Sequence, residues 1–290
     1  MRPGRLERVL VLMVPGKAGP TNLGRYDRLV TEAPSTDASV LTEQRGRILI
    51  ITINRPEAKN AINAAVSNGL AAAVDRLDDD PGLSLAIITG AGGSFCAGMD
   101  LKAFARGENV LAKGRGLGFT QRPPAKPIIA AVEGFALAGG TELALATDLI
   151  CAASNSAFGI PEVKRGLVAG AGGLLRLPQR IPYQIAMELA LTGDSLSAER
   201  GHALGLVNVL TEPGKALEAA VELGERITAN GPLAVAATKR IITESRAWDP
   251  ADQWREQMKI LMAAIGANGA TEGTIELADE RAPTGTGRCF

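Results

Sequence analysis

Short apolar segments alternate with helical patterns through the middle of this chain, and the alternation limits the folds open to it. Residues 47–53, 85–89, 128–132 and 149–152 are brief, almost wholly apolar runs, as expected of strands covered on both faces. An amphipathic helical pattern over residues 64–80 follows the first run and ends in three aspartates before Pro81 and Gly82. A shorter helix is predicted over residues 141–146. The alternation predicts an α/β core.

The last third of the chain is predicted to be mostly helical. Helical patterns cover residues 185–191, 198–204, 215–229, 233–245 and 252–265. We therefore expect an α/β core over residues 41–230 and a helical C-terminal region over residues 231–290. Residues 233–265 carry more apolar side chains than a segment lying on one core needs, so we expect them to pack against a neighbouring subunit.

Residues 1–40 differ from the rest of the chain. Basic residues are scattered among Pro and Gly, and the apolar stretch at residues 9–14 is shorter than the roughly 7–15 residues of a secretory signal. Glu7, Asp27 and Glu32 argue against a transit peptide. We expect a weakly ordered N-terminal extension or a start codon placed too early.

Charge and residue counts exclude several classes of partner. Lys+Arg and Asp+Glu number 31 each, so no net charge attracts nucleic acid or an anionic membrane. No apolar run reaches the roughly 18 residues of a membrane span. The three cysteines lack CxxC spacing, which argues against a disulfide framework or a zinc site and for a reducing, cytoplasmic location. The one histidine, His202, is expected at a partly buried helix position, and a His-rich metal site has no second histidine.

Two glycine-rich segments invite a nucleotide-binding interpretation that their spacing does not support. Residues 90–95 and 170–175 both lack the last glycine of GxGxxG, and neither carries the GK[ST] of a P-loop. Two other small-residue turns, at residues 95–102 and 134–143, lie between a strand and the expected start of a helix. Unobstructed backbone N–H groups at such turns can form an oxyanion hole. The alternative is that these are tight turns that need glycine only for positive φ.

Two glutamates are candidate acid/base groups. Glu142 follows the second small-residue turn, and Glu162 follows the apolar run at residues 158–161. Apolar neighbours disfavour ionisation and raise the pKa of a carboxyl group toward the working range of an acid/base catalyst. Each could instead cap a helix or form a salt bridge.

Five segments, taken in order, resemble the enoyl-CoA hydratase/isomerase, or crotonase, family from about residue 41 onward. They are NRP at 54–56 with NA at 60–61, FCAGMDL at 95–101, AVEG at 131–134 with GGTE at 139–142, FGIPE at 158–162, and GAGG at 170–173 with LP at 177–178. The resemblance implies an α/β fold built as a right-handed spiral of β-β-α repeats with a C-terminal helical trimerisation region. It also implies a homotrimer, or a hexamer made as a dimer of trimers.

The same resemblance implies a site and a reaction. The backbone N–H groups of Met99 and Gly139 would form the oxyanion hole, and Glu142 and Glu162 would be catalytic. The substrate-binding residues would be Ala97, Gly98, Asp100, Leu101, Lys102, Lys59, Gly140 and Gly170. The reaction would be syn addition of water across the 2,3 double bond of a 2-enoyl-CoA thioester, with no metal and no cofactor, since coenzyme A belongs to the substrate. Lys59 and Lys102 would meet its phosphates or remain solvated.

Other activities stay open within this resemblance. A Δ3-Δ2 enoyl-CoA isomerase, or another enolate-forming acyl-CoA enzyme, would use the same scaffold, although isomerases usually keep one acid and this chain has both. A CoA-ester or RNA binding protein with a vestigial site is disfavoured as an RNA binder by the zero net charge. A ring-cleaving or dehalogenating relative would ordinarily need an Asp or His nucleophile. The segment at residues 272–288 lacks the aromatic residues of the family's C-termini.

Overall fold

The computed structural model describes residues 38–266. Residues 1–37 of the expected N-terminal extension and residues 267–290 of the expected helical region lie outside the described residues. No helix within residues 38–266 is long and apolar enough to cross a membrane.

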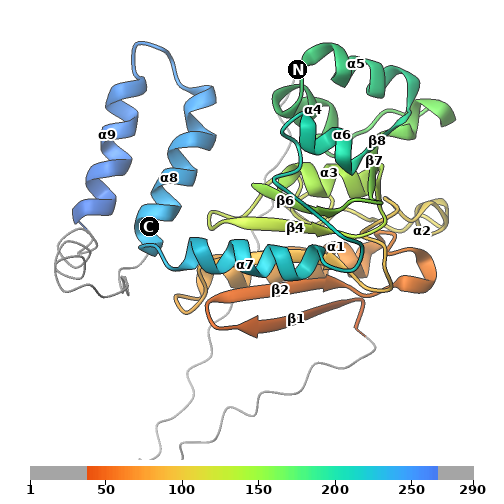
Figure 1. The fold of residues 1–290 in the computed structure, drawn as a ribbon, viewed down its shortest axis with the longest axis horizontal. Coiled ribbons are helices and arrows are strands. Elements are labelled where there is room, and N and C mark those ends of the chain that lie inside the picture. The colour runs from red at the N-terminus through yellow and green to blue at the C-terminus, as the bar shows by residue number, and fades with distance from the viewer. Residues whose placement is uncertain (1–37, 267–290) are drawn as a thin grey trace, which may run out of the picture. The chain divides into compact units, whose positions relative to one another are not determined.

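A six-stranded sheet forms the centre of the fold (Figure 1). Its strands, in spatial order, are β1 (Val40–Arg45), β2 (Ile48–Ile53), β3 (Leu85–Gly90), β4 (Ile128–Val132), β6 (Leu149–Ala153) and β9 (Val209–Thr211). All neighbouring pairs are parallel except β1 and β2, which form an antiparallel hairpin around Gly46. The four predicted strands are confirmed. The sequence interpretation missed β1 because its polar, largely exposed second half hides the pattern.

Both faces of this sheet are covered, as its apolar strands predicted. In β2, Ile48 and Ile50 face one way and pack with the helix α7 (Ala216–Thr228), whereas Leu49, Ile51 and Ile53 face the other way. The opposite face belongs to the larger core cluster, which includes the apolar side of α1 (Ala64–Asp79). Figure 1 shows α7 running along the sheet. Side chains alternate because successive residues of a strand point to opposite faces.

The chain also forms a second, smaller sheet. It contains β5 (Phe135–Leu137), β7 (Ala157–Gly159) and β8 (Ser195–Ser197), in that order. The chain passes from β4 to β5, through the helix α3 (Gly139–Ala146), back to β6 and on to β7. This is the β-β-α turn that the resemblance implied. The short strands were not predicted, because three residues are too few to show a period of two.

The remaining helices lie mostly in the second half of the chain. They are α2 (Leu101–Ala105), α4 (Gly173–Arg180), α5 (Tyr183–Thr192), α6 (Ala198–Ala203), α8 (Pro232–Glu244) and α9 (Gln253–Ala264), with 3₁₀ turns η1 (Pro56–Ala58), η2 (Pro161–Arg165) and η3 (Ser245–Ala247). Helices α8 and α9 form an antiparallel pair beside the core (Figure 1). The predicted helical C-terminal region is thus confirmed within the described residues. His202 lies in α6 as expected but is exposed rather than partly buried, its Nδ1 lying 2.9 Å from the Val207 carbonyl.

An ion pair joins α8 to the core. The Nζ of Lys239 lies 2.7 Å from Oδ2 of Asp148 and 2.9 Å from the Lys126 carbonyl oxygen. By contrast, much of the apolar side of α9 has no cover within the described residues, with Trp254 exposed by 77% and Met262 by 57%. These side chains are the apolar surface that the sequence indicated for residues 233–265.

Candidate active site

The first small-residue turn is fixed by Asp100 at the start of α2. Its Oδ1 accepts hydrogen bonds from the backbone N–H groups of Lys102 and Ala103, which caps the helix. Its Oδ2 accepts from both terminal nitrogens of Arg55, each at 3.1 Å. The Ala103 N–H, and then the Arg55 guanidinium, lower the pKa of Asp100. Asp100 therefore holds the turn that carries Met99.

The second turn leads into α3 through a strained residue. Ala138 has φ 50 and ψ −124, a conformation that L side chains rarely adopt. Its N–H donates to the Gly159 carbonyl and its carbonyl accepts from the Glu142 N–H, so the fold determines the conformation on both sides. This geometry starts α3 at Gly139, whose N–H has no acceptor inside the helix.

The two turns are in direct contact, and glycine makes this possible. A Cβ added at Gly140 would lie 2.2 Å from the Cys96 carbonyl oxygen, and one added at Gly98 would lie 2.8 Å from Cβ of Ala138. Within residues 38–266, neither the Met99 N–H nor the Gly139 N–H donates a hydrogen bond. The N–H groups of Met99 and Gly139 therefore both lack an acceptor, and they lie where the two turns are in contact.

Glu142 lies on α3 and is 3% exposed. Its Oε1 accepts from the backbone N–H groups of Ala171 at 2.7 Å and Gly173 at 3.0 Å, at the start of α4. Two N–H donors to one oxygen stabilise negative charge on it. The Thr141 hydroxyl fixes the helix that carries Glu142, lying 2.6 Å from the Ala136 carbonyl and accepting from the Gly159 N–H.

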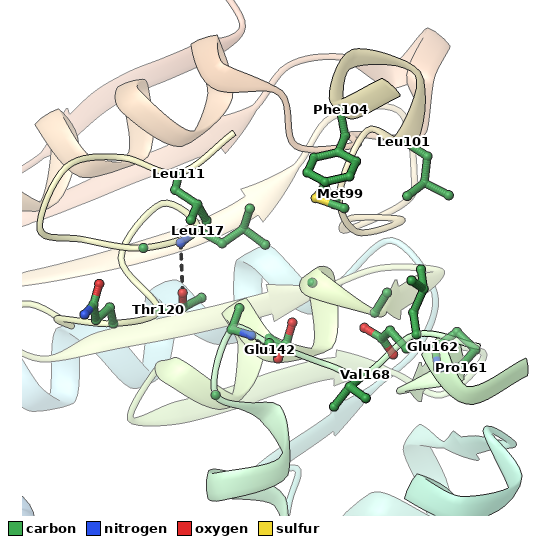
Figure 2. Close-up of a pocket in the computed structure, with 18 of the residues that line it drawn as sticks. Met99, Leu101, Phe104, Leu111, Leu117, Thr120, Glu142, Pro161, Glu162 and Val168 are labelled. Atoms are coloured by element: carbon green, nitrogen blue, oxygen red, sulfur yellow. Dashed lines mark hydrogen bonds between the residues drawn. The ribbon is translucent and has the colours of Figure 1, made fainter. Parts of the chain in front are cut away.

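Glu162 lies in the first turn of η2, directly after Pro161. Its Oε2 is buried and has no hydrogen-bond partner within the described residues. Burial raises the pKa of Glu162 and the nearby Glu142 carboxylate raises it further, against a lowering by a hydrogen bond from its own backbone N–H and a smaller lowering by Arg165. Figure 2 shows the two carboxyl groups pointing toward one another. The pair thus contains one carboxyl group that accepts two backbone N–H groups and one whose pKa is raised.

Both glutamates line a cavity of about 780 Å³. Its walls are mainly apolar, with Leu101 and Phe104 opposite Glu162 in Figure 2 and Leu111, Leu117 and Val168 around them. Of the residues implied by the resemblance, the cavity brings together Ala97, Met99, Leu101, Gly139, Glu142, Glu162 and Gly170. Lys59, Gly98, Asp100, Lys102 and Gly140 do not line it. Lys59, directly after η1, and Lys102, in α2, are both exposed.

Several cavity residues were missed by sequence reasoning. Thr120 and Gln121 come from the irregular segment before β4, where no periodic pattern signals a role. Arg176 lies in α4, a helix that was not predicted because the glycines at residues 170–173 mask its helical pattern. Arg165 lies three residues after Glu162 in η2, outside the motifs that carry the resemblance.

Comparison with known proteins identifies the family. The pattern described as enoyl-CoA hydratase/isomerase matches residues 43–286. The chain belongs to this family. The resemblance seen in the sequence and the fold expected from it are therefore confirmed.

Individual relatives share most of their length with this enoyl-CoA hydratase/isomerase family member. The crystal structure of the enoyl-CoA hydratase EchA1 from Mycobacterium marinum is 74% identical, with a TM-score of 0.85, covering 87% of this chain and 100% of that one. The enoyl-CoA hydratase EchA19 of Mycobacterium tuberculosis is 40% identical over 84% of this chain and 94% of its own length. The carnitinyl-CoA dehydratase of Proteus mirabilis is 38% identical over 84% of this chain and 97% of its own.

Proposed function

We propose that this family member is a 2-enoyl-CoA hydratase, adding water in the syn sense across the 2,3 double bond of the thioester. The observation that carries the proposal is the pairing of Glu142 and Glu162 beside two unused backbone donors in one cavity. Related proteins named enoyl-CoA hydratase support it. Both carboxyl groups are present, as addition of water needs a base for the water and an acid for the carbon.

Each part of the site has one step in this mechanism. The thioester oxygen accepts hydrogen bonds from the Met99 and Gly139 N–H groups, which stabilise the enolate as charge develops, a contribution of about 10²–10³ in rate per donor. Glu142, as carboxylate, takes a proton from water while the water oxygen bonds to C3. The enolate electrons return to C2, which takes the proton of Glu162. Glu142 thus gains a proton and Glu162 loses one, and proton exchange with solvent restores the starting protonation of the pair.

The direct test is hydration of crotonyl-CoA by the full chain. We expect the absorbance of the conjugated enoyl thioester to fall and 3-hydroxybutyryl-CoA to form, because the cavity supplies both proton-transfer groups. The reaction in ²H₂O should place deuterium at C2 of the product. Firm binding of crotonyl-CoA without hydration would reject the hydratase proposal and favour an isomerase.

The isomerase alternative makes a different use of the same cavity. A Δ3-Δ2 isomerase moves a proton between C2 and C4 and adds no water. It would be favoured if Glu142→Ala abolished hydration while proton exchange at C2 continued. The retention of both carboxyl groups, with the Glu162 pKa raised, favours the hydratase.

We further propose that no cofactor takes part and that the coenzyme A moiety lies along the turns that carry Lys59 and Lys102. The side-chain carboxyl groups and backbone N–H groups named above supply every proton transfer and the charge stabilisation that the proposed steps need. The lysines would meet phosphates as point charges. The buried, unpaired thiols of Cys96 and Cys151 agree with a reducing, cytoplasmic location.

We propose that the chain assembles as a trimer, or as two trimers. The exposed apolar side of α9 supports this, since a surface of that kind is normally covered. Sedimentation at micromolar concentration should give three or six times the mass of one chain. Trp254→Glu should shift the population toward monomers, and Gln253→Glu, which adds the same charge at a polar position of the same helix, should not. A monomeric wild-type chain would contradict the proposal.

A further inference from the structure

The segment that binds the Glu142 carboxyl group consists mainly of glycine. Residues 170–173 read GAGG, and the backbone N–H groups of Ala171 and Gly173 are the two that Oε1 of Glu142 accepts. Glycine loses more conformational freedom on folding than any other residue, so a segment of this composition does not keep its shape by itself. A Cβ added at Gly170 would meet no atom closer than 4.0 Å, so no crowding fixes the chain there. Contacts from other parts of the chain must therefore keep the two N–H groups in place.

Arg176 in α4 makes such contacts. Its backbone N–H donates to the Gly172 carbonyl at 3.1 Å, and Nη1 of its side chain donates to the Ala171 carbonyl at 3.4 Å. A Cβ added at Gly172 would lie 2.3 Å from Nη1, so the guanidinium lies directly over this glycine. Arg176 thus contacts the stretch of backbone between the two N–H groups that bind Glu142.

The guanidinium also binds a part of the chain that is fixed to the core. Nη2 of Arg176 donates to the Thr120 carbonyl oxygen at 2.6 Å. Thr120 is 1% exposed, and its hydroxyl accepts from the Leu117 N–H at 3.0 Å, the bond drawn in Figure 2. The Gly118 N–H donates to the hydroxyl of Ser67, in α1, at 2.7 Å. Arg176 therefore joins a glycine-rich segment to one that is attached to a core helix.

Arg176 lies near Glu142 without forming an ion pair with it. Burial lowers the pKa of Arg176 and Arg180 lowers it further, whereas the Glu142 carboxyl group raises it. None of the ion pairs among residues 38–266 includes Arg176. Arg176 can thus act on Glu142 in two ways, by its charge and through the backbone of residues 171–173. Only the second way fixes the position of Oε1.

Resting on the proposed hydratase function, we propose that Arg176 is a positioning residue for the catalytic base. Its guanidinium fixes residues 171–173, so that the Ala171 and Gly173 N–H groups stay on Oε1 of Glu142. The carboxyl group then keeps the orientation in which it faces Glu162 in Figure 2. A misplacement of a reacting group by about 1 Å can lower a rate by about 10².

A double-mutant cycle with Glu142 tests this role. Arg176→Met replaces the guanidinium by an unbranched apolar side chain. We expect it to lower kcat for crotonyl-CoA hydration by about 30-fold or more and to change KM by less than about threefold, because a misplaced base affects the transition state. In the Glu142→Gln background, where no base remains to be positioned, it should lower kcat by less than about threefold. A general structural role would lower kcat by the same factor in both backgrounds.

Arg176→Lys separates position from charge. Lysine keeps the positive charge but has one nitrogen in place of the two that face the Thr120 and Ala171 carbonyls. We expect Arg176→Lys to lower kcat by about tenfold or more. A kcat equal to that of the wild type would show that charge alone acts and would overturn the inference.

Arg180→Met is the matched control. Arg180 lies in the same helix and is half-buried like Arg176, and its Nη2 donates to the carbonyls of Leu145 and Thr147 at the end of α3. It does not line the cavity. Arg180→Met should lower the free energy of unfolding, as Arg176→Met does, because each removes hydrogen bonds to backbone carbonyls. It should leave kcat within about threefold of the wild type.

Hydrogen exchange tests the inference without turnover. Arg176→Met should speed exchange of the Ala171 and Gly173 amides by about tenfold or more, and Arg180→Met should not. The exchange measurement and the cycle apply equally to Arg176→Lys if Arg176→Met does not fold. Absence of hydration in the wild type, with this exchange pattern, would reject the hydratase and retain the positioning role. Hydration with unchanged exchange at both amides, or with equal losses of kcat in the two backgrounds, would overturn the positioning role and retain the hydratase.

Discussion

Replacing Glu142 by glutamine is expected to lower kcat for crotonyl-CoA hydration by about 10²–10⁴ while leaving the chain folded. The amide oxygen of glutamine can still accept from the Ala171 and Gly173 N–H groups, so the contact between α3 and α4 remains. The amide cannot take a proton from water at neutral pH, so the base is lost. Crotonyl-CoA hydration and thermal unfolding of the purified variant measure the two effects separately.

The matching change at Glu162 should reveal its protonation state. Glu162→Gln is expected to lower kcat by a similar factor, about 10²–10⁴, because the amide cannot protonate C2. The acid form of Glu162 exists below its pKa, and burial raises that pKa. In the wild type, activity should therefore persist as pH rises past the ordinary range of a carboxyl group and fall as pH rises through the raised pKa. The residual activity of the variant should lack this fall.

A chemically matched control is available at Glu133. Its two carboxylate oxygens also accept backbone N–H groups, those of Gly214 and Ala216, but it does not line the cavity. Glu133→Gln should keep kcat within about twofold, since distant changes rarely alter a transition-state contact. Hydration within tenfold of wild type in both Glu142→Gln and Glu162→Gln would exclude them as the acid/base pair.

Gly140→Ala is expected to lower both stability and activity by large amounts. The added Cβ would lie 2.2 Å from the Cys96 carbonyl oxygen, which belongs to the backbone and cannot rotate away. The start of α3 would have to move away from the turn at residues 95–99, which should lower the free energy of unfolding by about 3 kcal/mol. Because this contact also brings the Met99 and Gly139 N–H groups together, kcat should fall by about 10²–10³. Thermal unfolding and the crotonyl-CoA assay measure the two losses.

The control for this change is Gly170→Ala. Gly170 also belongs to a glycine-rich segment and lines the cavity, but an added Cβ would meet no atom closer than the Val168 carbonyl at 4.0 Å. Gly170 does not require positive φ, so the substitution should change the free energy of unfolding by less than about 1 kcal/mol. If Gly140→Ala were as stable as Gly170→Ala, the close packing of the two turns would be refuted.

Helices and strands with strong periodic patterns could be predicted, because the pattern reflects which of their faces are buried. The strands β2, β3, β4 and β6 and the helix α1 carry enough residues to show whether one face or both are covered. The short strands β5, β7 and β8 were not predictable, because contacts with distant segments stabilise them and their own sequences show no period. The helix α4 was not predictable either, because it follows glycines, and these allow backbone N–H groups to reach Glu142.

The sequence alone identified the family and marked the two glutamates and the two turns as candidates, because ordered motifs fix residue types and their spacing. Only the tertiary structure decided that Gly140 is required by the Cys96 carbonyl, that Asp100 caps α2 rather than lining the cavity, and that Arg165 and Arg176 add positive charge to it. These features depend on atoms brought together from segments far apart in the chain. The strength of these interactions depends on interatomic distance and on burial, and neither can be read from the spacing of residues in the sequence.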